Sequence, residues 1–248
     1  MGTVVAQGGV QQGLLQRYRD LVPAEARLGE TLAREGLRIG ASVVEQWPVV
    51  HDHLQLYARG FSRAGLLVLA GAPDEGSRRT GIPFTGPAEA RARLGLDVPG
   101  DLASPAGAVF WDAVGDAPPE VLFGAIHLAH ACPFDAPAHE AVRDAAAKHL
   151  LGLLDLARPQ AVVALGADAL AALAQATGER DLAGLARAPE SAWLERWPAG
   201  TRLLRLPFAE VPARPPFRTR VAPLPSLAGP HARASGQALA SLLRVALP

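Results

Sequence analysis

The chain has 248 residues, enough for one domain with a substantial buried core. Its 24 basic and 24 acidic residues cancel, so there is no overall basic signature of nucleic-acid binding. The single cysteine, Cys132, excludes a disulfide within the chain and an iron–sulfur cluster held by four of its own cysteines. No apolar run has the length of a membrane span and no leader-like segment follows Met1, so we expect a cytoplasmic protein without membrane contacts.

Charge is unevenly distributed along the chain. Residues 211–248 contain five arginines and no aspartate or glutamate, which gives this stretch a local charge of +5. Such a stretch is typical of a face that binds an anionic partner, and equally of a solvated tail. Arg218 and Arg220 are its candidates for contacts to an anion.

The first sixty residues have mainly helical patterns. Residues 24–36 are expected to form a helix that ends at Gly36, and residues 43–59 have helical spacing interrupted by Pro48. We therefore expect an N-terminal helical extension over 1–59, packed on a core domain that spans 60–248.

A long polar loop follows the first expected strand. Residues 66–70 are apolar and suit a buried strand of a parallel sheet, whereas residues 71–85 break into Gly, Pro and charged residues. The loop ends in the apolar step Ile82-Pro83-Phe84, and a buried Phe84 ring is a natural platform for a flat ligand. Such a loop is typical of a ligand site at the carboxyl end of a parallel strand, and an ordinary surface loop is the alternative.

Apolar runs and helical patterns alternate through the rest of the chain. This order predicts an α/β fold, a three-layer α/β/α domain with a four-stranded, mainly parallel central sheet. Besides 66–70, strands are expected at 121–128, 159–166 and 201–207, helices at 87–94, 101–114, 138–157, 167–177 and 232–245, and a Pro- and Arg-rich loop at 208–222.

The polar loop resembles the first active-site motif of the uracil-DNA glycosylase superfamily, in the variants written roughly G-E-A-P-G…R-x-T-G-x-P-F. Residues 79–89 carry most of this likeness. In that family the loop holds the hydrolytic water and the phenylalanine stacks on the flipped base. The resemblance implies that Phe84 is the stacking ring, that Ala72 and Pro73 lie beside the base, and that Asp74 and Glu75 lie on the water side.

The loop after the second expected strand contains Cys132-Pro133-Phe134, which fits the family's N-A-x-P-F-x-P pattern. In the family the amide of the Asn reads the uracil edge. His130 stands in the place of this Asn, and an imidazole cannot present an adjacent donor and acceptor as an amide does. The resemblance implies that His130 binds the base with altered selectivity, and a packed loop histidine is the alternative.

Leu224-Pro225-Ser226 occupies the place of the family's second motif, H-P-S, between the last strand and the last helix. The family's His stabilises charge that develops on the uracil oxygen, and Leu224 cannot do this. By resemblance Pro225 and Ser226 contact DNA, and Leu227 is the minor-groove wedge that pushes the base out of the stack. His231 is a further candidate for this DNA contact.

Branches of the family with alanine at the position of Ala72 use another carboxylate to activate water. Asp74, Glu75 and Asp112 are available, and we favour Asp74 or Glu75. A carboxylate near the anomeric carbon orients water and stabilises an oxocarbenium-like transition state. Phosphate contacts are expected from Arg79 and the basic C-terminal stretch.

The resemblance covers roughly residues 60–245. It implies a monomeric DNA glycosylase without metal or cofactor, which flips a damaged, uracil-type deaminated base and hydrolyses its N-glycosidic bond in DNA repair. The missing His and Asn favour the alternative, a catalytically silent DNA-binding relative. A third, more distant hypothesis is an α/β enzyme that acts on a free nucleoside. Such an enzyme would not bind DNA, whereas the other two proteins would.

Overall fold

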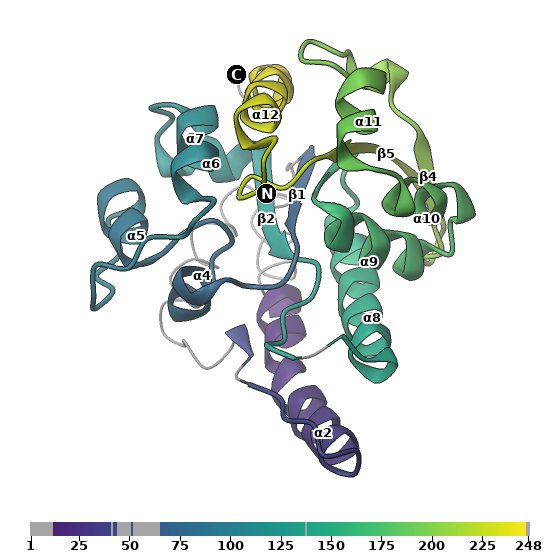
Figure 1. The fold of residues 1–248 in the computed structure, drawn as a ribbon. Helices are drawn as coiled ribbons and strands as arrows, with labels where there is room; N and C mark the ends of the chain where they lie inside the picture. The colour runs from purple at the N-terminus through teal and green to yellow at the C-terminus, as the bar shows by residue number, and fades with distance from the viewer. Residues whose placement is uncertain (1–11, 41, 44–50, 52–64, 137, 247–248) are drawn as a thin grey trace, which may run out of the picture.

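The structure is a computed structural model, and it describes residues 12–40, 42–43, 51, 65–136 and 138–246. A five-stranded sheet in the order β2-β1-β3-β5-β4 forms its centre (Figure 1). The strands are β1 (Leu66–Ala70), β2 (Ile126–His130), β3 (Ala161–Leu165), β4 (Phe208–Val211) and β5 (Phe217–Leu224).

Four of the strands are parallel. β1 pairs with β2 on one side and β3 on the other, and β3 pairs with β5, whereas β4 is an antiparallel edge strand beside β5. Every residue of β1, β2 and β3 is buried, as expected for a parallel sheet with helices on both faces. The carboxyl ends of the four parallel strands therefore meet at one edge, near Ala70, His130, Leu165 and Leu224.

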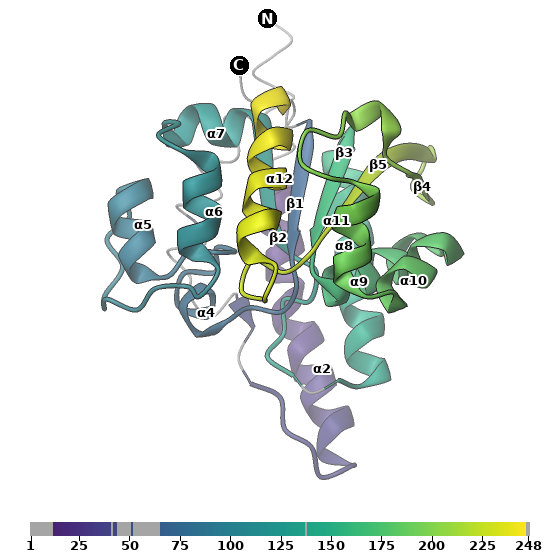
Figure 2. The same cartoon turned by 45° about the horizontal axis from the view of Figure 1, so that its top comes forward.

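Helices flank the sheet on both faces (Figures 1 and 2). α6 and α12 pack together on one face, and α8 and α9 pack together on the other. The predicted α/β class and the three-layer arrangement are confirmed. The helices are α2 (Leu21–Ala33), α4 (Glu75–Thr80), α5 (Pro87–Leu94), α6 (Gly107–Val114), α7 (Pro119–Ala125), α8 (Glu140–Ala157), α9 (Ala167–Thr177), α10 (Arg180–Arg187), α11 (Glu190–Arg196), α12 (Ala232–Ala246) and the 3-10 helix η3 (Leu203–Arg205).

The end of the sheet differs from the prediction of four strands. Residues 201–207 hold η3 instead of a strand, and the expected loop 208–222 forms β4 and most of β5. The prolines that suggested a loop lie where strands tolerate them. Pro215 and Pro216 lie in the turn, and Pro223 lies beyond Arg220, where the pairing of β4 with β5 ends.

The second expected strand, 121–128, is also displaced. Residues 119–125 form α7, which begins with Pro119 in its first turn, and β2 starts only at Ile126. A short apolar run does not distinguish a buried helix from a buried strand, which is why the pattern was misread. As a result, His130 is the last residue of β2 and not part of the following loop.

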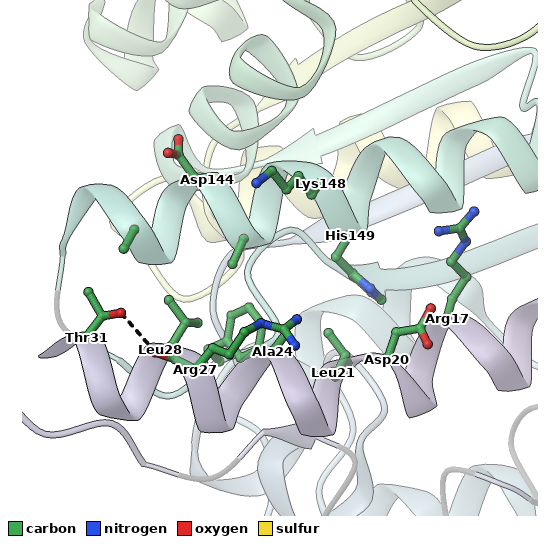
Figure 3. A pocket seen from close by; sticks show the side chains of 13 residues that line it. Arg17, Asp20, Leu21, Ala24, Arg27, Leu28, Thr31, Asp144, Lys148 and His149 are labelled. Carbon is green, nitrogen blue, oxygen red and sulfur yellow. Dashed lines mark hydrogen bonds between the residues drawn. The ribbon is translucent and has the colours of Figure 1, made fainter. Parts of the chain in front are cut away.

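The N-terminal helix α2 packs against α8 and leaves a pocket of about 410 Å³ between them (Figure 3). His149 points from α8 toward α2, and its ring meets the edge of Tyr18 at a centroid distance of 5.8 Å. Most of the predicted helix 43–59 lies outside the described residues, so the domain division at residue 60 stays a prediction. Within the described part of the chain, no helix has the length and apolar character needed to cross a membrane.

Candidate functional site

A pocket of about 370 Å³ lies at the carboxyl ends of the parallel strands. In the strand order, β2 lies on one side of β1 and β3 lies on the other. The chain therefore leaves the carboxyl ends of β1 and β3 in opposite directions along the sheet. Ligands bind at such switch points in open α/β sheets. The pocket is lined by Ala70, Gly71, Ala72, Asp74, Ser77, Phe84, Pro105, Ala106, His130, Leu165, Gly166, Ala167, Asp168, Glu190, Ser226, Leu227 and Ala228.

The Asp74 carboxylate lines this pocket and both of its oxygens are held. Oδ1 accepts a hydrogen bond from the Ser77 backbone N–H at 2.8 Å, which makes Asp74 the N-cap of α4. Oδ2 accepts one from the Ser104 hydroxyl at 2.7 Å. Each carboxylate oxygen is able to accept a further hydrogen bond, so Asp74 can orient a water molecule although both of its oxygens are already bonded.

The other candidate carboxylates do not line the pocket. The Glu75 side chain is 67% exposed and pairs with Arg79 across one turn of α4, at 3.7 Å. Asp112 is exposed on α6. The structure therefore separates Asp74 from Glu75, which their adjacent positions in the sequence could not do. Pro73 is buried behind the loop, whereas Ala72 lines the pocket.

Phe84 forms an aromatic wall of the pocket. Its ring is 6% exposed and stacks on Phe110 at a centroid distance of 4.8 Å and an interplanar angle of 21°. The backbone of Phe84 is left-handed, with φ 60°, which is uncommon for a bulky residue. Thr80 holds this turn, because its hydroxyl donates to the Thr85 carbonyl at 2.6 Å and accepts from the Ile82 N–H at 3.0 Å.

His130 reaches the pocket from the end of β2 and is only 4% exposed. Burial lowers its pKa from 6.5 to about 4, although Asp74 and the Gly71 carbonyl act in the opposite direction. The imidazole is therefore neutral at pH 7, with one donor and one acceptor nitrogen. Both nitrogens are buried, and neither has a hydrogen bond of normal geometry to another described residue.

We expect acid to destabilise this protein through its buried histidines. Burial lowers the pKa of His127 to about 3 and that of His130 to about 4, whereas unfolded histidine titrates near 6.5. Below pH 6.5 the unfolded state binds protons that the folded state does not, so stability falls toward pH 4. Between pH 7 and pH 5 each imidazole accounts for a loss of about 2 kcal/mol.

Urea unfolding of the wild type and of His130→Gln at pH 7 and pH 5 measures this loss. The variant should lose about 2 kcal/mol less than the wild type between the two pH values, because its side chain does not titrate. An equal pH dependence in both proteins would show that His130 binds its proton as readily in the folded state as in the unfolded state.

Glu190 also lines the pocket, although no pattern in the sequence indicates it. Its Oε1 accepts a hydrogen bond from the Ala167 N–H at 3.0 Å and its Oε2 accepts one from the Ser226 N–H at 3.2 Å. The side chain thereby joins the loop after β3 to the loop after β5. Glu190 begins α11 in a stretch without a recognisable motif, so no local signal indicated this role.

The segment after β5, whose contacts to DNA stay a prediction, lies partly at the pocket. Ser226 and Leu227 line the pocket, whereas Leu224 is buried and borders a separate small cavity with Trp197 and Leu242. Pro225 and His231 do not line the pocket.

The structure does not support Leu227 as an exposed wedge. Its side chain is 2% exposed because it packs into the core beside the pocket. The exposed residues at this tip are Ala228 and Pro230.

Arg218 and Arg220, the expected phosphate contacts of the basic C-terminal stretch, lie at the opposite end of the sheet from the pocket. Arg220 is paired with Ala161, the first residue of β3, whereas the pocket lies beyond the last residue, Leu165. Both guanidinium groups lie over the Phe208 ring, at 4.5 and 4.1 Å from its centroid. A strand advances about 3.3 Å per residue, so Arg218 is roughly 20 Å from the pocket end of β5.

We expect Arg79→Ala to weaken DNA binding and Arg218→Ala to leave it unchanged. Arg79 is exposed on α4, the helix that also contains the pocket residue Ser77, whereas Arg218 is at the far end of the sheet. Loss of one phosphate contact reduces the slope of log K against log salt by about 0.9. Fluorescence anisotropy with a labelled duplex at several salt concentrations measures both variants, and a reduced slope for Arg218→Ala alone would reverse the assignment.

Comparison with known proteins places the chain in a family. The family model described as the uracil DNA glycosylase superfamily matches residues 59–228, and the chain belongs to this superfamily. One solved structure similar to it is the crystal structure of wild-type Pedobacter heparinus SMUG2, with a TM-score of 0.49 and 14% identity over 85% of this chain and 88% of that chain. No curated protein matches the chain.

No group of three or more His, Cys, Asp or Glu side chains in the described ranges is arranged to hold a metal ion. Likewise, no Lys or Arg is among the described residues that line the pocket, which contains the carboxylates of Asp74, Asp168 and Glu190. The pocket thus combines an aromatic wall, acidic groups and one neutral imidazole. This combination suits a flat heterocycle attached to a centre that develops positive charge.

Proposed function

We propose that this protein is a monofunctional DNA glycosylase that acts as a monomer in the cytoplasm. It flips a damaged, deaminated base of the uracil type out of DNA and hydrolyses its N-glycosidic bond. The observation that carries the proposal is the convergence of Phe84, Asp74 and His130 on one pocket at the carboxyl ends of the strands. Membership of the uracil DNA glycosylase superfamily supports the same reaction class.

In this proposal the flipped base stacks on Phe84, whose other neighbour in the stack is Phe110. Stacking on an aromatic side chain accepts any base, because every base has a π-face. His130 then selects among bases through its single N–H and single acceptor nitrogen at the base edge. Since both nitrogens are buried without a normal hydrogen bond, a base that satisfies them gains the free energy that an unpaired polar group otherwise costs.

The hydrolytic step uses the fixed carboxylate. As the bond between C1′ and the base nitrogen breaks, its electron pair leaves with the base and the sugar becomes oxocarbenium-like. Asp74 stabilises this positive charge and orients the water that attacks C1′, and its hydrogen bonds to Ser77 and Ser104 keep it from rotating away. The leaving base accepts a hydrogen bond from the N–H of His130, and the water's proton passes to solvent.

Base release from end-labelled oligonucleotides tests the proposal. Single and double strands would carry uracil, hypoxanthine, xanthine or a mismatched normal base, and alkali would cleave the abasic sites that form. Strand cleavage at one base in the wild type, absent with Phe84→Ala, would establish a glycosylase and its substrate. A wild type that cleaves none of these strands would contradict the proposal.

A second function, binding of DNA bases without cleavage, is favoured by the position of Leu224. This residue replaces the family's His and borders a different cavity, so no side chain at this position contacts the base pocket. Retained affinity for the modified strands, together with the absence of any base release, would support this silent relative. Absence of both DNA binding and base release would instead point to a free nucleoside.

A further inference from the structure

A short segment before α6 meets Asp74 through a buried hydrogen bond. Ser104 is 3% exposed, and its Oγ donates to Oδ2 of Asp74 at 2.7 Å. The other carboxylate oxygen of Asp74, Oδ1, accepts a hydrogen bond from the Ser77 N–H, and α4 fixes the position of that N–H. Ser104 is therefore the one side chain among the described residues that is seen to donate a hydrogen bond to the Asp74 carboxylate.

Glu89 holds the backbone of Ser104 in place. Its Oε2 accepts hydrogen bonds from the Ser104 N–H at 3.2 Å and from the Gly86 N–H at 2.8 Å. Hydrogen bonds to a charged acceptor are stronger than those between neutral groups. One carboxylate on α5 thus ties the segment before α6 to the end of the Phe84 loop.

Three glycines leave room for this segment. A Cβ on Gly86 would collide with the Leu102 carbonyl, and one on Gly76 would lie 3.0 Å from the backbone of Ala103 and Ser104. A Cβ on Gly107 would lie 2.6 Å from the Glu89 carboxylate. Any larger residue at Gly76 or Gly86 would press on the backbone of residues 102–104, whereas one at Gly107 would press on the Glu89 carboxylate that accepts from the Ser104 N–H. The close approach of Ser104 thus depends on glycine at two positions beside its backbone, Gly76 and Gly86, and on Gly107 for the space that the Glu89 carboxylate occupies.

We propose that Ser104 is a positioning residue that holds the Asp74 carboxylate in the orientation needed for hydrolysis. The inference rests on the proposed glycosylase function and adds the group that sets the geometry of its carboxylate. Without the hydroxyl, Oδ2 loses its side-chain donor. The Asp74 carboxylate is then held only by the hydrogen bond from the Ser77 N–H and can rotate. A displaced carboxylate orients water less well, and effects of this kind reach large factors for small displacements.

The test compares Ser104→Ala with the wild type in single-turnover release of the base that the wild type removes. Ser104→Ala should lower the rate constant roughly 10-fold, as expected from the loss of one hydrogen bond to a charged group. Ser104→Thr keeps the hydroxyl and should recover most of this loss. Ser235→Ala, which removes a buried hydroxyl on α12 with no hydrogen-bond partner among the described residues, is the matched control and should not slow the reaction.

A double-mutant cycle separates positioning from a general loss of structure. In an Asp74→Asn background, Ser104→Ala should cause little further loss, because the group on which it acts is already gone. The cycle is run at a temperature at which thermal unfolding shows all four proteins to be folded. A Ser104→Ala rate equal to that of the wild type, or an equal loss in both backgrounds, would overturn this inference alone. A wild type that releases no base would overturn the proposed function and this inference with it.

Discussion

Asp74→Asn is expected to lower the single-turnover rate of base release by roughly 100- to 1000-fold, the range typical of a positioned general base or charged stabiliser. The change replaces the pocket carboxylate with a neutral group of the same shape. The amide oxygen can still accept the Ser77 N–H that caps α4, so the helix should remain intact. DNA affinity should change by less than about 2-fold, because no phosphate contact is removed.

Glu75→Gln is the matched control for this prediction. It makes the same chemical change at the neighbouring residue, whose side chain is exposed and pairs with Arg79 outside the pocket. Its rate at saturating protein should remain within about 2-fold of the wild type. If Glu75→Gln were the slower variant, the water-activating carboxylate would be Glu75, and the loop would have to rearrange on binding DNA.

Phe84→Leu is expected to reduce kcat/KM by roughly 10- to 100-fold, since stacking of a base on an aromatic ring is worth about 1–3 kcal/mol. Leucine keeps much of the packing against Phe110 but cannot stack on a base. Phe84→Ala should lose at least as much activity, and it should also lower the free energy of unfolding by about 3–5 kcal/mol because the ring is buried. Kinetic assays and urea unfolding of the two variants separate stacking from stability.

Phe208→Leu provides the comparison for Phe84→Leu. Phe208 is partly exposed on the edge strand β4, where it contacts Arg218 and Arg220, far from the pocket. Its replacement should leave kcat/KM unchanged. A similar loss from both variants would mean that aromatic side chains act through general stability, and Phe84 would no longer be assigned as the base platform.

The fixed carboxylate and the neutral imidazole have different physical origins, and they complement each other. Asp74 stays at its position because two donors hold it, whereas His130 stays neutral because burial lowers its pKa to about 4. In the proposed reaction, the glycosidic bond would break with the Asp74 carboxylate on the sugar side and the neutral His130 donor on the base side. Under this proposal, the arrangement would stabilise the oxocarbenium-like sugar more directly than the leaving base.

Much of the fold follows from local patterns in the sequence. The strand at 66–70, the core of the strand at 159–166 and the helices at 87–94 and 167–177 are confirmed, because apolar runs and glycine ends are local signals. The motif that ends in Phe84 likewise predicts a ligand loop at the end of β1, which is where the pocket lies. Local patterns were insufficient where apolar runs were short, at α7, and where prolines lie on an edge, at β4 and β5.

Tertiary structure alone decided which side chains share the pocket. Asp74 and Glu75 are adjacent in the sequence, yet one lines the pocket and the other faces solvent, because the first turn of α4 points successive residues in different directions. Ser104 and Glu190 come from distant segments and reach their partners only through the packing of the layers. Leu227 and Arg218 show the converse, since Leu227 is too buried to be an exposed wedge although it lines the pocket, and the direction of β5 places Arg218 at the far end of the sheet. The sequence by itself therefore determined the family, the layers and the ligand loop, and long-range packing decided the set of residues that can act together.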